Sequence, residues 1–123
     1  MKIHTSLLLT TLVLASPSLW AADASHGEAL FKQECSDCHN ATIPGKNRKG
    51  PALFGVVNRP NGSLADYNYS DGMRQQHFDW DISHLDAYLA APKKAIPGGK
   101  MKYDGLEDGV ARADIIAYLS QNH

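Results

Sequence analysis

The strongest signal in this sequence is a five-residue motif, Cys35-Ser36-Asp37-Cys38-His39. The pattern C-x-x-C-H is the signature of c-type haem attachment. Its spacing suits that chemistry, because two thiols must reach two vinyl groups on one edge of a porphyrin while an imidazole reaches the iron. Residues three and four apart share one face of a helix. We therefore predict that Cys35, Cys38 and His39 point toward one flat cofactor, a single covalently bound haem c.

Three other kinds of site fit the motif less well. A thioredoxin-like thiol pair needs a βαβ context, and no strand-rich segment precedes Cys35. A zinc site needs about four ligands, usually from a second cysteine pair, but the chain has only 2 cysteines. A disulfide between Cys35 and Cys38 would be sterically awkward and would leave His39 without a role.

The amino terminus has the features of a secretory signal peptide. Lys2 supplies a positive charge, an apolar run spans residues 7–15, and small residues follow it. The run is too short to span a membrane, so we expect no permanent membrane anchor. We predict that residues 1–24 are the signal peptide, cleaved between residues 21 and 24. The sequence Ala22-Asp23-Ala24 fits the small-x-small rule best, and a cut after Ala21 also fits.

Residues 25–123 are then predicted to be one domain located in a bacterial periplasm. In that compartment cysteines normally form disulfides, whereas haem attachment would consume both thiols. The 12 basic and 13 acidic residues of the chain give a formal net charge of −1, which argues against nucleic-acid binding. A domain of this size buries a modest fraction of its surface, and a haem would add a large apolar element to its core.

The apolar pattern predicts an all-α fold with three main helices and long loops. The first helix is predicted to open at the capping box Ser25-x-x-Glu28 and to run to about Cys38. The second covers residues 81–91, where Ser83 and Asp86 resemble a second helix start. Its predicted apolar face consists of Ile82, Leu85 and Leu89.

The third helix is predicted over residues 108–122, with a buried stripe formed by Val110, Ile115, Ile116, Tyr118 and Leu119. A short helix over residues 70–75, capped by Ser70, is also compatible with the pattern. Residues 40–69 show no periodicity, and a loop of that length usually serves a function or is disordered. Because this segment carries several apolar and aromatic residues, we expect it to wrap around a group that is not protein.

A haem held by one histidine needs a second axial ligand to act as a stable electron carrier. The segment Pro97-Gly98-Gly99 before Met101 can bend sharply and bring a thioether onto a flat cofactor, so we predict Met101 as this ligand. We expect Met73 to pack against the cofactor and the histidines to lie on the surface. The candidates considered were Met73, Met101, His26, His77, His84 and His123.

Axial ligation by histidine and methionine has a functional consequence. Such ligation raises the reduction potential of a haem, and it leaves no open position for oxygen or substrate. We therefore predict an electron shuttle rather than an enzyme, in which His39 and Met101 are the axial ligands of the iron.

Further motifs extend the pattern over the rest of the chain. They are Gly27 and Phe31, Lys49-Gly50-Pro51-x-Leu53, Arg59, Tyr67-x-Tyr69-Ser70, Trp80, Tyr88-Leu89, Pro92-Lys93-Lys94, Ile96-Pro97-Gly98-x-Lys100-Met101, and Asp114-Ile115-Ile116-Ala117-Tyr118-Leu119. Together with the haem motif, they resemble class I cytochromes c of the mitochondrial type and their small periplasmic relatives. The resemblance covers Gly27 to Leu119, and it implies the cytochrome c fold.

The resemblance also implies roles for residues around the haem. The carbonyl of Pro51 would accept a hydrogen bond from His39 and orient it. Arg59, Tyr69 and Trp80 would hydrogen-bond a haem propionate.

Tyr88 would form a hydrogen bond near the Met101 sulfur. The first and last helices would cross at Gly27, Phe31, Ile115 and Tyr118. Two positions depart from the mitochondrial type, because Gly99 replaces a frequent threonine and Met73 lies near a frequent asparagine.

Basic residues cluster near the two predicted ligand loops. They are Lys93, Lys94, Lys100 and Lys102 around Met101, and Lys46, Arg48 and Lys49 after His39. A lysine-rich haem edge would steer an acidic redox partner, such as an oxidase, a reductase or a dehydrogenase. We expect the protein to be a monomer. Two other classes stay open at this point: a gas-binding or peroxidase-like haem protein with a displaceable Met101, and a thiol oxidoreductase.

Overall fold

The computed structural model describes residues 21–123, so most of the predicted signal peptide lies outside the described residues. The helices are α1 (Ala24–Glu34), α2 (Asp71–Arg74), α3 (Ile82–Ala90), α4 (Pro92–Ala95) and α5 (Gly109–Gln121). Pairing of β type in the described part is limited to an isolated bridge between Pro60 and Asp79. The predicted all-α class with three main helices is confirmed.

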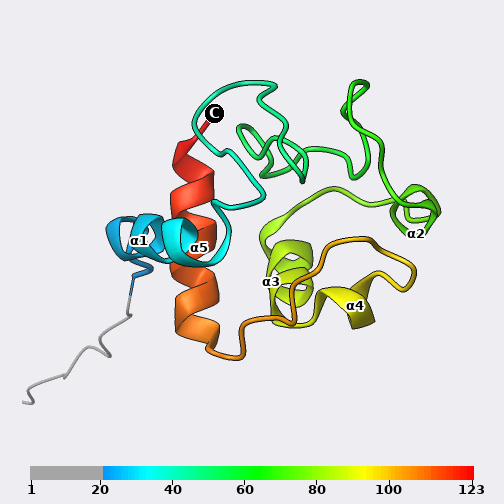
Figure 1. Cartoon of the computed structure of the whole chain (residues 1–123). Helices are drawn as coiled ribbons and strands as arrows, with labels where there is room; N and C mark the ends of the chain where they lie inside the picture. Colours follow the sequence, from blue (N-terminus) through cyan, green and yellow to red (C-terminus); the bar gives the residue numbers. More distant parts are fainter. Residues whose placement is uncertain (1–20) are drawn as a thin grey trace, which may run out of the picture.

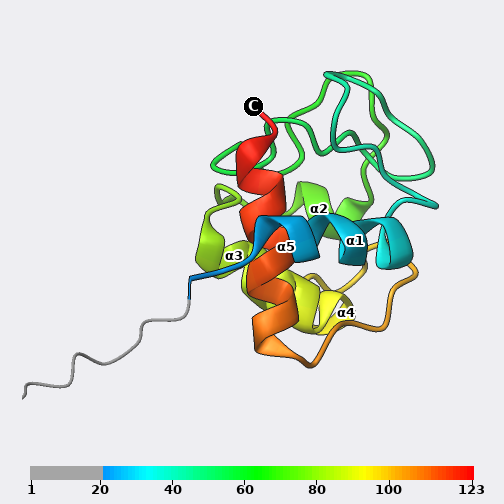
Figure 2. The ribbon, with the colours of Figure 1, turned by 90° about the vertical axis from the view of Figure 1, so that its left-hand side faces the viewer.

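The crossing of α1 over α5 is the most extensive helix contact (Figures 1 and 2). A Cβ atom placed on Gly27 would lie only 1.8 Å from the backbone oxygen of Asp114. Glycine therefore lets the two backbones touch. Beside it, the rings of Phe31 and Tyr118 pack with centroids 5.5 Å apart. The predicted crossing at Gly27, Phe31, Ile115 and Tyr118 agrees with this geometry.

Asp114 fixes the start of α1 from inside this crossing. Its buried carboxylate accepts a hydrogen bond from the backbone N–H of Asp23 at 2.7 Å and pairs with Nδ1 of His26 at 2.7 Å. These hydrogen bonds hold the pKa of Asp114 below its usual value. The side chain of Asp23 in turn accepts from the N–H of His26. The predicted cap at Ser25 is wrong, because Asp23 takes that place.

Helix α1 also ends earlier than predicted. Its last residue is Glu34, Cys35 is its C-cap, and the haem motif forms a turn beyond the helix rather than its final turn. The backbone of this turn nevertheless keeps a helical contact, since the N–H of His39 donates to the carbonyl of Cys35 at 2.9 Å.

The faces of α3 and α5 agree with the predicted pattern except in their first turns. Leu85 is buried in α3, and α5 buries Ile115, Ile116, Tyr118 and Leu119. Ile82 and Val110, however, are 64% and 70% exposed. The buried stripes begin one residue to one turn later, at Leu85 and Ala111. The cap of α3 is Asp81, which accepts from the N–H of His84, and the predicted start at Ser83 is wrong.

The two single-turn helices flank the loops. Ser70 caps α2 as predicted, because its hydroxyl accepts from the N–H of Met73. Helix α4 was not predicted; Pro92 occupies its first position, where the missing proline N–H costs no hydrogen bond. Residues 40–69 form loops near the end where α5 finishes, whereas α3 and α4 lie toward the other end (Figures 1 and 2).

Backbone hydrogen bonds tie the loops to the helical frame. Gly55 donates to Asn122, Asn58 donates to Trp80, and Leu106 donates to Leu89, at 2.7, 2.7 and 2.9 Å. The loops are thus ordered by long-range contacts and not by periodic structure of their own. No helix in residues 21–123 is long and apolar enough to cross a membrane.

We predict that Gly27→Ala lowers the free energy of unfolding of the haem-loaded protein by about 2–3 kcal/mol, because the new methyl group would overlap the α5 backbone. Urea unfolding measures the change. Gly109→Ala is the matched control, since its Cβ would meet no backbone atom of another element and only Nη2 of Arg112, at 3.3 Å. This control should be neutral or stabilising by about 0.5 kcal/mol. Equal losses in both variants would contradict the steric explanation.

Candidate functional site

The haem motif occupies the turn after α1. The N–H groups of Cys38 and His39 both donate to the carbonyl of Cys35, at 3.1 and 2.9 Å. One carbonyl thus gathers the three motif residues into a single turn. Cys35 is half-buried, Cys38 is exposed, and no disulfide joins them.

The Cys35 thiol is not activated for exchange chemistry. Burial, followed by the nearby Glu34 and Cys38, raises its pKa to about 11. A thiol that reacts in disulfide exchange needs the opposite shift, because the thiolate is the nucleophile. This observation argues against the thiol oxidoreductase hypothesis.

His39 is oriented by the hydrogen bond expected from the sequence. Its Nδ1 lies 2.8 Å from the carbonyl oxygen of Pro51. Because a carbonyl can only accept, Nδ1 carries the proton and Nε2 keeps its lone pair. Burial, partly offset by this hydrogen bond, lowers the pKa of His39 and favours the neutral imidazole. A neutral ring with a fixed Nδ1–H is the form that binds a metal through Nε2.

Gly50 lets the next loop pass flat against this imidazole. A Cβ atom on Gly50 would lie 2.3 Å from Cε1 of His39. The N–H of Gly50 donates to the carbonyl of Cys38 at 2.8 Å. Gly50 therefore packs against the ring in addition to the predicted hydrogen bond from His39 to Pro51.

Arg59 places an uncompensated positive charge beside the loops. Its Nη1 and Nη2 donate to the carbonyls of Phe54 and Ala52 at 3.2 and 2.8 Å, whereas its Nε is buried without a partner. Burial lowers the pKa of Arg59. Within residues 21–123 no carboxylate forms an ion pair with it. A half-buried cation whose buried Nε donor has no partner fits a cofactor that carries carboxylates.

The aromatic residues expected at the site lie in or against the core of the protein. Tyr69 and Trp80 are buried, and Trp80 packs against Tyr88 with ring centroids 5.0 Å apart. The hydroxyl of Tyr69 accepts from the N–H of Leu64 at 3.2 Å. Burial raises the pKa of Tyr88 to about 12, so its hydroxyl stays protonated and able to donate.

Met101 is half-buried in the irregular segment between α4 and α5. Met73 is half-buried too, and its sulfur lies 3.7 Å from the amide nitrogen of Asn61. The remaining candidate ligands, His26, His77, His84 and His123, are all exposed. His26 and His84 each pair with an aspartate, Asp114 and Asp81.

Three of the basic residues predicted to dock a partner form contacts within the chain. Lys93 forms an ion pair with Asp104 at 2.9 Å, and Arg48 donates to the carbonyl of Ser36 at 2.8 Å. The Nζ of Lys100 donates to the carbonyl of Asn68 and lies 4.6 Å from the centre of the Tyr67 ring. Lys46, Lys49, Lys94 and Lys102 are exposed.

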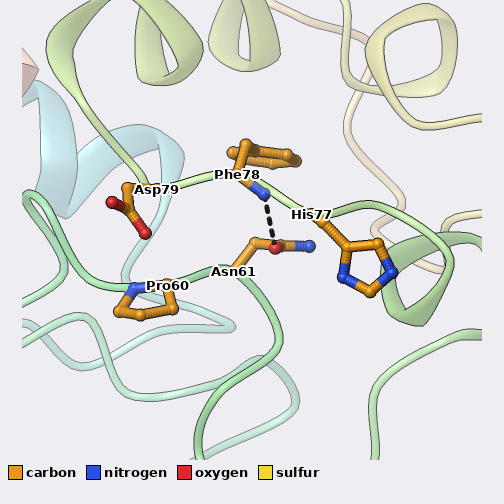
Figure 3. A pocket seen from close by; sticks show the side chains of 5 residues that line it. All are labelled: Pro60, Asn61, His77, Phe78 and Asp79. Atoms are coloured by element: carbon orange, nitrogen blue, oxygen red, sulfur yellow. Dashed lines mark hydrogen bonds between the residues drawn. The ribbon is translucent and has the colours of Figure 1, made fainter.

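An open pocket lies at the Pro60–Asp79 bridge, lined by Pro60, Asn61, His77, Phe78 and Asp79 (Figure 3). The Asn61 amide joins its two sides, because it accepts from the N–H of Phe78 and donates to the carbonyls of Met73 and Gln76. No residue of the predicted haem site lines this pocket. Asn61 is a structural residue that the sequence did not reveal, since its partners lie 12–17 positions away.

No group of three or more His, Cys, Asp or Glu side chains in residues 21–123 could hold a metal ion by itself. The C-x-x-C-H motif is the signature of haem attachment, and a porphyrin brings its own equatorial ligands to the iron. His39 with its proton on Nδ1, the unpaired Nε of Arg59 and the two nearby thiols fit a covalently attached haem.

Comparison with known proteins supports this interpretation. The family model described as Cytochrome c matches residues 24–123. Cytochrome c from Gibberella zeae is 42% identical over 100 residues, which cover 81% of this chain and 94% of that protein. Cytochrome c-type cyt cy from Rhodobacter capsulatus is 39% identical over 108 residues, covering 88% of this chain and 53% of that protein. The solved structure of cytochrome cH from Methylobacterium extorquens superposes with a TM-score of 0.75 at 42% identity, covering 81% of this chain and 99% of that one.

We predict that Arg59→Met destabilises the haem-loaded protein by about 2–3 kcal/mol, because it leaves the carbonyls of Ala52 and Phe54 without their charged donor. Its reduction potential should also fall, since a nearby positive charge favours the reduced iron. Urea unfolding and a potentiometric titration measure the two effects. Arg48→Met, which removes one exposed hydrogen bond, should leave both near the wild-type values. A potential unchanged in Arg59→Met would contradict the placement of Arg59 beside the cofactor.

Proposed function

The chain belongs to the cytochrome c family, and from this membership we propose that it is a periplasmic carrier that shuttles single electrons through a haem ligated by His39 and Met101. Proteins of this family are electron carriers rather than enzymes and bind haem c covalently, and Cys35 and Cys38 stand at the positions of its C-x-x-C-H motif. We propose in addition that His39 and Met101 are the axial ligands, that the protein is periplasmic, and that its partners are redox proteins.

The orientation of His39 is the main observation that supports binding of a haem iron at this position. The carbonyl of Pro51 fixes the proton on Nδ1, so the Nε2 lone pair is available for the iron without reorganisation of the ring. Cys35 and Cys38 would form the two thioether bonds from the same turn. When bound, the haem supplies a one-electron couple whose iron changes oxidation state with little change in geometry.

The other residues of the site would set the reduction potential of the haem and close its axial positions to other ligands. Arg59, together with Tyr69 and Trp80, would donate hydrogen bonds to a haem propionate. This propionate would give the unpaired Nε of Arg59 an acceptor. Tyr88 would donate its hydroxyl proton toward the Met101 sulfur. A soft, neutral sulfur favours the ferrous iron and so raises the potential. With both axial positions filled by protein, no position is left for oxygen or peroxide, which disfavours a gas-binding or peroxidase-like role.

The proposed partners are redox proteins, such as an oxidase, a reductase or a dehydrogenase, that dock a monomer at its lysine-rich haem edge. Of the lysines predicted there, Lys46, Lys49, Lys94 and Lys102 are exposed and form neither an ion pair nor a side-chain hydrogen bond within the described part of the chain, whereas Lys93 pairs with Asp104 and Lys100 donates to the carbonyl of Asn68. Rim charges of this kind raise the rate of association and keep complexes short-lived.

Export to the periplasm rests on the proposed signal peptide. The structure bears on where it would be cut, because Asp23 caps α1 and donates its N–H to the buried Asp114. A cut after Ala24 would remove both interactions. Cleavage after Ala21 or Ala22 would keep them, so we place the proposed cleavage site before Asp23.

We predict that Met101→Ala abolishes the sulfur-to-iron absorption band of the oxidised protein and lowers the reduction potential. The reduced variant should also bind carbon monoxide rapidly, whereas the wild type should not. Met73→Ala is the matched control, because its thioether is proposed only to pack, and it should keep the band. Persistence of the band in Met101→Ala would contradict the proposed ligand. Rapid, tight binding of carbon monoxide by the wild type would favour a gas-binding function.

We also predict that the full-length chain, expressed in a Gram-negative host that matures c-type haem, appears in the periplasm with Ala22 or Asp23 as its first residue. Intact-mass spectrometry of the purified protein measures this. A chain that begins at Ser25 would contradict the role assigned to Asp23. A full-length chain found in the cytoplasm would contradict export itself.

A further inference from the structure

The segment that carries Met101 is joined to the rest of the protein mainly through side chains, such as the ion pair of Asp104 with Lys93 and the hydrogen bond from Tyr103 to Glu34. It runs from Ile96, buried at the end of α4, to Leu106, whose N–H donates to Leu89. Between Gly99 and Leu106, the described residues show no backbone hydrogen bond that joins this stretch to another part of the chain. A thioether on such a segment needs other contacts to hold it in place.

The first contact is a close approach between backbones. A Cβ atom on Gly72 of α2 would lie 2.3 Å from the carbonyl oxygen of Pro97 and 2.6 Å from the carbonyl carbon of Gly98. Helix α2 therefore abuts the turn that precedes Met101 (Figure 1). Glycine at position 72 is required because any side chain would push this turn away.

The second contact is made by Lys100, the residue directly before Met101. Its ammonium group donates to the carbonyl of Asn68 and lies 4.6 Å from the centre of the Tyr67 ring. Within residues 21–123 this is the only hydrogen bond that joins residues 100–102 to the rest of the chain. A charged donor gives a stronger hydrogen bond than a neutral one, and the aromatic face adds a cation–π attraction.

Tyr67 extends this chain of contacts to the opposite ligand loop. Its hydroxyl donates to the carbonyl of Lys49 at 2.8 Å. Lys49 precedes Gly50, which packs directly on the His39 ring. The segment 67–72 thus contacts both loops that carry the proposed axial ligands.

We propose that residues 67–72 form a clasp between the two ligand loops, and that Lys100 and Gly72 are positioning residues for the Met101 sulfur. This inference rests on the proposed ligation by Met101. The sequence predicts Lys100 to be a docking residue, whereas its contacts with Asn68 and Tyr67 give it a role in holding the loop that carries Met101. The charge of Lys100 acts within the molecule, through Asn68 and Tyr67, and not on a redox partner.

The test is displacement of the sulfur from the oxidised iron by added imidazole, followed through the sulfur-to-iron absorption band. We expect Lys100→Met to need about tenfold less imidazole than the wild type, as the loss of one charged hydrogen bond implies. Lys102→Met is the matched control, an exposed lysine in the same segment, and should stay within twofold. Lys100→Arg keeps the donors and the charge and should recover most of the wild-type resistance.

The outcomes separate this inference from the proposed function. Equal imidazole resistance in Lys100→Met and Lys102→Met would overturn the positioning role, and Lys100 would then be one of the docking residues. A sulfur-to-iron band that survives in Met101→Ala would overturn the ligand assignment itself. Gly72→Ala offers a second variant: if it folds with haem, it should also weaken the hold on the sulfur, and an unchanged resistance would overturn the steric part of the clasp.

Discussion

The covalent link between the chain and its haem is the constraint on which the remaining structure depends. The turn that carries Cys35, Cys38 and His39 follows the α1–α5 crossing directly, so the most closely packed part of the protein holds the attachment point. Residues 40–69 and 96–107 have little regular structure and cannot form a core alone. A large apolar group at their centre supplies the surface against which they order, and the unpaired Nε of Arg59 is proposed to bind one of its carboxylates.

The sequence predicted the elements whose signals are local. Three main helices, the buried stripe from Ile115 to Leu119, the cap at Ser70 and the hydrogen bond between His39 and Pro51 all follow from short patterns or from the family resemblance. The helix starts were less well predicted. Ser25 and Ser83 match a capping pattern, but Asp23 and Asp81, two residues earlier in each case, are also favoured N-cap residues and take the caps. Asp23 gains a further advantage from Asp114, 91 positions away, which no local pattern can reveal.

The contacts that shape the candidate site are mostly of this long-range kind. Gly27, Gly50 and Gly72 each bring the backbone against a distant group, and their sequence neighbourhoods do not show which group it is. Lys100 illustrates the same limit, because a lysine beside other lysines suggests a docking surface while its ammonium binds Asn68. The exposure of Ile82 and Val110 shows that helical periodicity gives the face of a stripe but not its first residue.

The most direct test of a covalently held haem is a pyridine haemochrome spectrum of the purified protein after extraction with acidified acetone. We predict that one haem per chain stays with the polypeptide, that its spectrum shows both vinyl groups saturated, and that the variant with Cys35 and Cys38 both replaced by alanine loses the haem to the solvent. Haem released from the wild-type chain, or a colourless protein with two alkylatable thiols, would contradict the covalent attachment at Cys35 and Cys38.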